Sequence, residues 1–265
     1  MSGRVRPGRI ALIAGCVLIG IWLTAPTLVV IPMSFTEVKS LAFPPQGFTT
    51  EWYSNFFTDP LWHDALITSL KVAVLVTMIS VVLGTAAALG LVRGVFPGKS
   101  VINGILLTPI IVPVVVVGVG LFAVYLKWRL AGTIGGFVAA HTALALPFVV
   151  VTVGASVRTL DRRLELAAAN LGAGPWTTFR TVTLPLIRPG VIAGALFAFI
   201  TSFDEIVVSL FLQSPSVRTL PVQMYSSVTR DIDPTLAAAA SMIIVFTTSL
   251  ILLSMALRGR QSHAS

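Results

Sequence analysis

The stretch 161-DRRLELAAANLGAGPWTTFRTVTLPLIRPG-190 is polar and cationic, and it lies between two long apolar runs. Asp161 can cap a helix whose leucines and alanines recur at helical spacing. Gly172 stands where a helix would end in a left-handed residue, and Pro175 suits the first position of a second helix. The stretch therefore predicts two short helices that meet at a glycine turn outside the bilayer. A short helix with an exposed apolar face needs a partner to cover it.

The composition is that of a membrane protein. Hydrophobic residues make up 55% of the chain and charged residues 11%, and the mean hydropathy is +0.94. The net charge of +8 is spread between apolar runs and forms no basic face, which argues against nucleic-acid binding. Cys16 is the lone cysteine and lies in an apolar run, so no disulfide or metal framework is expected. The sequence predicts no cofactor and no metal site.

Apolar runs long enough to cross a bilayer as helices divide the chain into three parts. We expect an all-α membrane protein with six transmembrane helices, at 10–33, 65–92, 101–125, 134–157, 190–212 and 236–257. Residues 1–64 would hold a retained first span and an external loop with an aromatic-rich interfacial helix, because the first run is too long for a signal peptide. Residues 65–257 would form a core of five spans, including the cytoplasmic loop 158–189. Residues 258–265 would be a cytoplasmic tail.

The distribution of basic residues predicts that both termini lie in the cytoplasm. Most lysines and arginines fall in segments that this six-span topology places inside, as the positive-inside rule requires. The segments placed outside contain Lys39, Lys127, Arg129, Arg218 and Arg230.

One segment imitates a phosphate-binding loop. Gly98-Lys99-Ser100 matches the end of that motif, but Arg93 occupies the position of its first glycine. The motif also belongs between a strand and a helix of a soluble sheet. No nucleophile, metal or acid–base constellation assembles elsewhere in the sequence. We therefore expect no enzymatic activity, and no ATP hydrolysis by this chain.

Charged residues within the predicted spans are few, and they suggest function. Asp204 and Glu205 follow a stripe of small residues in the fifth span, and Lys71 lies in the second at comparable depth. Two hypotheses are open: Lys71 forms a buried ion pair with one acid, or an acid faces the translocation path and attracts a cationic substrate. Adjacent residues of a helix project about 100° apart, so both acids cannot face one partner. His141, in the fourth span, is either a hydrogen-bonded buried residue or a proton relay.

The stretch 161–190 resembles the EAA loop of permease subunits of ATP-driven, binding-protein-dependent importers. Ala167-Ala168, Gly172 and Leu184-Pro185 keep the spacing of that motif, with Val182 in place of isoleucine. Its glutamate position is Leu166, and Glu165 stands one place earlier. The resemblance implies a coupling helix that docks in a cleft of a separate ATPase subunit. The residues that it assigns to this coupling are Glu165, Ala167, Ala168, Gly172, Ala173, Pro175, Trp176, Leu184 and Pro185.

Residues 203–244 are similar to the second permease of spermidine/putrescine-type importers. Acidic residues after Phe203 and the segment from Leu220-Pro221 to Tyr225 carry this resemblance. It implies a permease of type I (MetI-like) fold in the bacterial inner membrane, with a substrate path that includes Phe203, Asp204, Glu205 and Tyr225. The implied partners are an ATPase dimer, a second permease, either a paralogue or a second copy, and an external solute-binding protein. The solute is expected to be a polyamine.

Other assignments stay open on the sequence alone. Related permeases for aminophosphonates, ferric iron and opines share much of the same pattern. A different class, an ATP-independent carrier or channel, usually has charged relays in several spans or a visible internal repeat, and this sequence has neither. A scaffolding membrane subunit would need no acids at depth.

Overall fold

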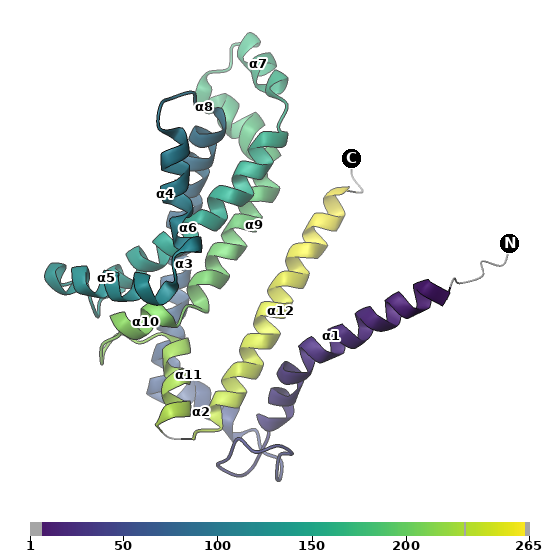
Figure 1. The fold of residues 1–265 in the computed structure, drawn as a ribbon, viewed down its shortest axis with the longest axis vertical. Coiled ribbons are helices and arrows are strands. Elements are labelled where there is room, and N and C mark those ends of the chain that lie inside the picture. The colour runs from purple at the N-terminus through teal and green to yellow at the C-terminus, as the bar shows by residue number, and fades with distance from the viewer. Residues whose placement is uncertain (1–6, 231, 263–265) are drawn as a thin grey trace. The chain divides into compact units, whose positions relative to one another are not determined.

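The computed structural model describes residues 7–230 and 232–262, and all regular structure within them is helical (Figure 1). This confirms the predicted all-α class. The elements are α1 (Pro7–Met33), α2 (Glu51–Thr58), α3 (Pro60–Arg93), α4 (Lys99–Ile111), α5 (Val114–Trp128), α6 (Ile134–Thr159), α7 (Arg162–Asn170), α8 (Pro175–Thr178), the π-helical turn η1 (Phe179–Thr183), α9 (Leu184–Phe203), α10 (Val207–Leu212), α11 (Leu220–Thr229) and α12 (Thr235–Ser262).

Within the described residues, four continuous helical segments are long and apolar enough to cross a membrane. They are Leu12–Met33, Pro60–Arg93, Ile134–Thr159 and Pro175–Phe203, and a fifth is reached if α4 and α5 count as one broken span. In α12 the apolar part Thr235–Ser249 is shorter. The structure thus supports four or five spans, and the sixth stays a prediction.

The span predicted at 101–125, with its two prolines, consists of two helices, α4 and α5, that meet at 105°. The break falls at Val112 and Pro113. Val112 is extended, with φ −73° and ψ 133°, as is favoured for a residue before proline. Pro113 also has no N–H with which to continue the helical ladder. Pro109, by contrast, lies inside α4 without ending it.

The helix predicted at 190–212 is shifted in the structure. Helix α8, η1 and α9 form one continuous helical segment from Pro175 to Phe203, so the second helix of the loop is the start of a long span rather than a separate short helix. The segment stops at Phe203, and the chain is non-helical at 204–206 before α10 begins. The acids at 204 and 205 therefore lie in a break, not within a continuous helix.

The chain forms two compact units. The first comprises Met1–Trp62 and Met224–Leu252. Within it α2 is joined to neighbouring segments by side-chain hydrogen bonds: the Trp52 indole donates to the Thr36 carbonyl at 2.7 Å, and the Asn55 amide donates to the Thr235 hydroxyl at 2.8 Å. Residues 51–58 of the loop are thus helical, and the position of this helix at the outer interface stays a prediction. The second unit comprises His63–Gln223 and Leu253–Ser265.

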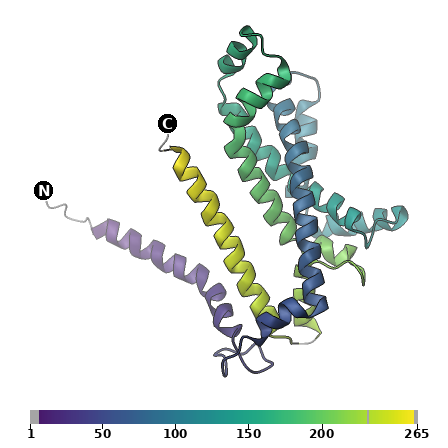
Figure 2. The ribbon, with the colours of Figure 1, turned by 180° about the vertical axis from the view of Figure 1, so that it is seen from behind.

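The second unit is built around α6, whose buried face includes Phe137, Val149 and Val153. Helix α9 packs along α6 (Figure 2), and glycines of the predicted small-residue stripe lie at this contact. A Cβ atom at Gly194 would lie 2.7 Å from the Thr152 hydroxyl and 3.1 Å from the Val149 Cα. Only glycine permits so close an approach here, which confirms the predicted role of the stripe in helix contact.

Candidate functional site

Helix α7 begins and ends as the sequence predicts. The Asp161 carboxylate accepts a hydrogen bond from the Arg163 N–H at 2.9 Å and caps the helix. Gly172 adopts φ +85°, a left-handed conformation, and the Ala173 N–H then closes back onto the Ala168 carbonyl at 3.0 Å. Pro175 is at the start of α8. The glycine turn therefore reverses the chain between α7 and the helix that leads into α9.

The turn carries an exposed apolar surface. No residue of α7 is buried, and large apolar side chains on either side of Gly172 are open, with Leu171 89% and Trp176 72% exposed. The Trp176 ring stacks on Phe179 with centroids 5.5 Å apart. We refer to Leu164, Leu166, Leu171 and Trp176 as the α7 surface. In Figures 1 and 2, α7 lies beyond the ends of α6 and α9, where a partner can reach it.

The residues assigned to coupling do not all lie on this surface. Ala167 and Pro175 are exposed, whereas Ala168 and Ala173 are half-buried. Leu184 is half-buried against the core of the second unit, in the first turn of α9, and Pro185 beside it is exposed. The Leu-Pro end of the motif therefore anchors the start of α9.

Glu165 is engaged within the chain. Its Oε1 atom accepts a hydrogen bond from the Arg93 guanidinium at 2.6 Å, and the Thr183 hydroxyl donates to the same oxygen. The two charged side chains are 26% and 17% exposed. The pair is separated by 72 residues in the sequence, and nothing in the local pattern announces it. Arg93 and Thr183 were not among the residues expected from the sequence.

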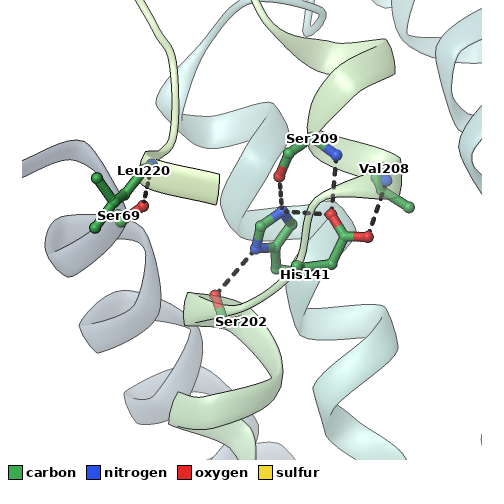
Figure 3. A network of polar contacts seen from close by, with 7 residues as sticks. Ser69, His141, Ser202, Val208, Ser209 and Leu220 are labelled. Carbon is green, nitrogen blue, oxygen red and sulfur yellow. Dashed lines mark hydrogen bonds and ion pairs between the residues drawn. The ribbon is translucent and has the colours of Figure 1, made fainter. Parts of the chain in front are cut away.

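A second polar cluster lies at the break after α9 (Figure 3). The Glu205 carboxylate accepts hydrogen bonds from the Val208 and Ser209 N–H groups, both at 2.9 Å. Ile206 is the N-cap residue of α10, and the Glu205 side chain just before it satisfies N–H groups of the first turn that lack helical partners. The Glu205 side chain is only 7% exposed.

His141 joins this cluster from α6. Its Nδ1 lies 3.0 Å from the Ser202 hydroxyl and its Nε2 lies 3.1 Å from the Ser209 hydroxyl. A carboxylate oxygen of Glu205 lies 3.6 Å from Nε2. Since both ring nitrogens of this fully buried side chain have partners, the structure supports the hydrogen-bonded interpretation of His141. Ser202 and Ser209 complete the cluster, and sequence reasoning did not assign them this role.

The other residues expected along the path are placed differently. Asp204 is exposed while Phe203 is buried. Lys71 is exposed on α3, and the ion pairs between described residues include none between Lys71 and either acid. Tyr225 is 48% exposed and belongs to the first compact unit. The two acids thus differ in the structure: the Glu205 carboxylate is buried and hydrogen-bonded, whereas Asp204 is exposed.

Residues 80–263 match the family described as the inner membrane component of binding-protein-dependent transport systems. The chain belongs to this family. It is 34% identical over 232 residues to the putrescine transport system permease protein PotI of Escherichia coli (strain K12), covering 84% of this chain and 82% of that relative. It is 29% identical over 242 residues to the spermidine/putrescine transport system permease protein PotC of Haemophilus influenzae, covering 91% and 94% of the two chains.

Solved structures agree on the fold. A chain of a bacterial alginate ABC transporter, solved in complex with an alginate pentasaccharide-bound periplasmic protein, superposes with a TM-score of 0.71. The match covers 92% of this chain and 91% of that chain at 16% identity, so it concerns the fold alone. With the family match, these findings make the protein an inner-membrane permease subunit of an ATP-binding-cassette importer, and not an enzyme.

Proposed function

We propose that this importer carries a polyamine and that Asp204 is the carboxylate that attracts it. Its relatives PotI and PotC are named for putrescine and spermidine, and the similarity extends over most of this chain. A polyamine is a flexible polycation, so a path for it needs an open carboxylate. Asp204 is the exposed member of the acidic pair, and this observation carries the proposal.

The geometry favours the path hypothesis over the ion pair for Asp204. Each oxygen of the Glu205 carboxylate accepts an α10 N–H group and its side chain is only 7% exposed, so it is not open to a substrate amine. Lys71 is exposed, and among the described residues it forms no ion pair with either acid. Asp204 is therefore the acid proposed to face the translocation path. Phe203 and Tyr225 are further candidate residues of the path.

The α7 surface is proposed to dock on a separate ATPase subunit. Its exposed leucines and Trp176 need a partner to cover them, and the left-handed Gly172 fixes the direction in which α7 projects. ATP-driven movement of the ATPase pair would then move α7, and the continuous helix from Pro175 to Phe203 would carry that movement toward the break at Asp204. The residues proposed for coupling are those of the EAA-like motif, including Ala167, Ala168 and Gly172.

The proposed assembly has six spans with both termini in the cytoplasm. The spans would be α1, α3, the broken pair α4–α5, α6, the segment Pro175–Phe203 and α12. Residues 1–64 and the core 65–257 would then be two functional regions, with the cytoplasmic loop 158–189 contacting the ATPase and 258–265 as a tail. The arginines that precede the first span at positions 4 and 6 lie outside the described residues. The further proposed partners are a second permease and an external solute-binding protein.

Uptake measurements test the substrate. The complex would be assembled with its ATPase, second permease and binding protein in proteoliposomes, and entry of labelled putrescine and spermidine would be measured. We expect ATP-dependent uptake, competed by unlabelled polyamine. Competition instead by an aminophosphonate, an opine or ferric iron would contradict the polyamine assignment, and uptake without ATP would contradict the importer mechanism.

The acids provide the matched pair of variants. Asp204→Asn should assemble normally and lower polyamine uptake by about tenfold, the effect of losing one favourable charged contact of ~1.4 kcal/mol. Glu205→Gln should instead lower the amount of folded protein. Normal uptake by the Asp204→Asn complex would exclude this carboxylate from the path.

A further inference from the structure

One side chain of α7 makes the hydrogen bonds that join this helix to other elements of the second unit. No residue of α7 is buried, and its leucines at 164 and 166 are exposed. The cap from Asp161 is local, because its carboxylate accepts the Arg163 N–H in the first turn of α7 itself. Of the side chains of α7, all of which the structure describes, Glu165 is the one that hydrogen-bonds to another element.

A single carboxylate oxygen joins three elements. Glu165 Oε1 accepts hydrogen bonds from two side chains. One is the guanidinium of Arg93, the last residue of α3, and the other is the hydroxyl of Thr183, the last residue of η1. The Arg93 contact of 2.6 Å is short, as expected for a charge-assisted hydrogen bond. The Thr183 side chain is buried, with 1% of the residue exposed. Partial burial shields this ion pair from the solvent screening that weakens surface pairs.

The position of Thr183 adds a second observation. It ends a five-residue π-helical turn between α8 and α9, and single π turns within helices occur frequently at functional sites. The turn directs a threonine of the continuous segment Pro175–Phe203 onto the acid of α7. The neighbouring Thr181, in contrast, is exposed and donates to the Thr177 carbonyl of its own helix.

We propose that Arg93 is a positioning residue that ties α7 to the cytoplasmic end of α3, so that movement of α7 is passed to α3 as well as to α9. This inference rests on the proposed docking of α7 on the ATPase. Without the tie, α7 can be displaced with no matching movement of α3, and ATP is then hydrolysed with less transport. Glu165 and Thr183 complete the tie, and none of the three needs to touch the ATPase.

The test compares transport with ATP consumption in the assembled complex with its ATPase, second permease and binding protein. We expect Arg93→Gln to retain the ATPase in the purified complex and to hydrolyse ATP, but to import about tenfold less solute per ATP, the loss that one charge-assisted contact represents. Lys99→Gln is the matched control, because Lys99 is a nearby cation at the start of α4 whose hydrogen bond goes to the Gly94 carbonyl, at 3.0 Å, and not to Glu165. It should transport normally.

Charge exchange separates a tie within the chain from a contact with the ATPase. The double variant Arg93→Glu with Glu165→Arg should recover much of the transport per ATP that each single reversal loses. Failure of the exchange to recover it, with Glu165→Gln impaired and Arg93→Gln normal, would show that Glu165 acts on the ATPase directly and would overturn the proposal.

Hydrogen exchange gives a readout independent of transport. In the same complex, amides of 162–170 should exchange about tenfold faster in Thr183→Val than in the original chain, and the matched variant Thr181→Val should leave them unchanged. Unchanged exchange in Thr183→Val and Arg93→Gln would overturn the tie. The docking proposal is tested separately, by altering the α7 surface and asking whether the ATPase is lost from the complex. The two proposals are therefore contradicted by different observations.

Discussion

Glu205 and Ser209 are joined twice in the structure: the Glu205 carboxylate accepts the Ser209 N–H at 2.9 Å, and His141 bridges to the Ser209 hydroxyl at 3.1 Å while lying 3.6 Å from the same carboxylate. This arrangement fixes the start of α10 immediately after the break in α9. Glu205 is thereby held inside the protein while Asp204 is exposed, which leaves Asp204 as the acid for the proposed contact with substrate.

Replacing Glu205 with alanine should destabilise the protein. Two N–H groups of α10 would lose their acceptor, and a buried unsatisfied donor costs about 1–3 kcal/mol. We expect a lower thermal midpoint for the purified chain in lipid nanodiscs. Asp204→Ala is the control, since its side chain is exposed. Equal loss of stability in the two variants would show that the cap contributes nothing.

Replacing Gly172 with valine should uncouple transport. A β-branched residue is strained at φ +85°, although a Cβ there would meet no neighbouring atom within 4 Å. The cost is therefore conformational, about 1–2 kcal/mol, and it would redirect α7. Uptake and transport-linked ATP hydrolysis by the assembled complex measure the effect.

Gly174→Ala is the matched control for this turn. Gly174 has φ −69°, a value that any residue adopts, and it too has open space around it. The control should transport normally. If Gly172→Val also transports and hydrolyses ATP normally, then the direction of α7 does not matter and the docking role is contradicted.

Replacing Gly194 with leucine should disrupt the packing of α9 on α6. The new side chain would meet the Thr152 hydroxyl and the Val149 backbone, and overpacking a close contact costs about 1–3 kcal/mol or more. The yield of folded protein and its thermal midpoint are the measurements. Gly90→Ala, in open space on α3, should be neutral, and equal behaviour of both variants would refute the close contact.

Replacing Lys71 with methionine should leave stability unchanged. Lys71 is exposed, so no buried carboxylate depends on it in this conformation. A fall in the thermal midpoint of more than a few degrees, reversed by adding Asp204→Asn, would instead reveal an ion pair between the two residues. The same melting experiment in nanodiscs therefore decides between the two hypotheses for the acids.

The sequence predicted the features that depend on local chemistry. The Asp161 cap, the left-handed Gly172 and the helical start at Pro175 follow from single residues and their neighbours, and all three are present. The all-helical class and the close contact at Gly194 follow from apolar length and small-residue spacing. These signals need no knowledge of what lies elsewhere in the chain.

The features that sequence reasoning missed depend on contacts between distant parts of the chain, or on whether a helix is interrupted at a given residue. Arg93 and Glu165 are far apart in the sequence, and Thr183 reaches the acid through a π turn that no residue pattern announces. The helix predicted to run through Asp204 and Glu205 ends at Phe203 in the structure. The Glu205 side chain instead accepts N–H groups at the start of α10. The span predicted at 101–125 is broken at Val112 and Pro113, where the extended Val112 lets α4 and α5 meet at 105°.

The turn between α4 and α5 has a consequence for how quickly the unassembled subunit is degraded in the cell. Helix α4 has 13 residues, about 20 Å at ~1.5 Å per residue, so in the proposed six-span arrangement the pair would place non-helical backbone at a depth where lipid offers no hydrogen bonds. Backbone of this kind persists in a membrane only when neighbouring protein or trapped water shelters it. In a subunit made without its partner subunits, this turn would be exposed to lipid. We expect proteases to degrade such a subunit faster than the assembled one.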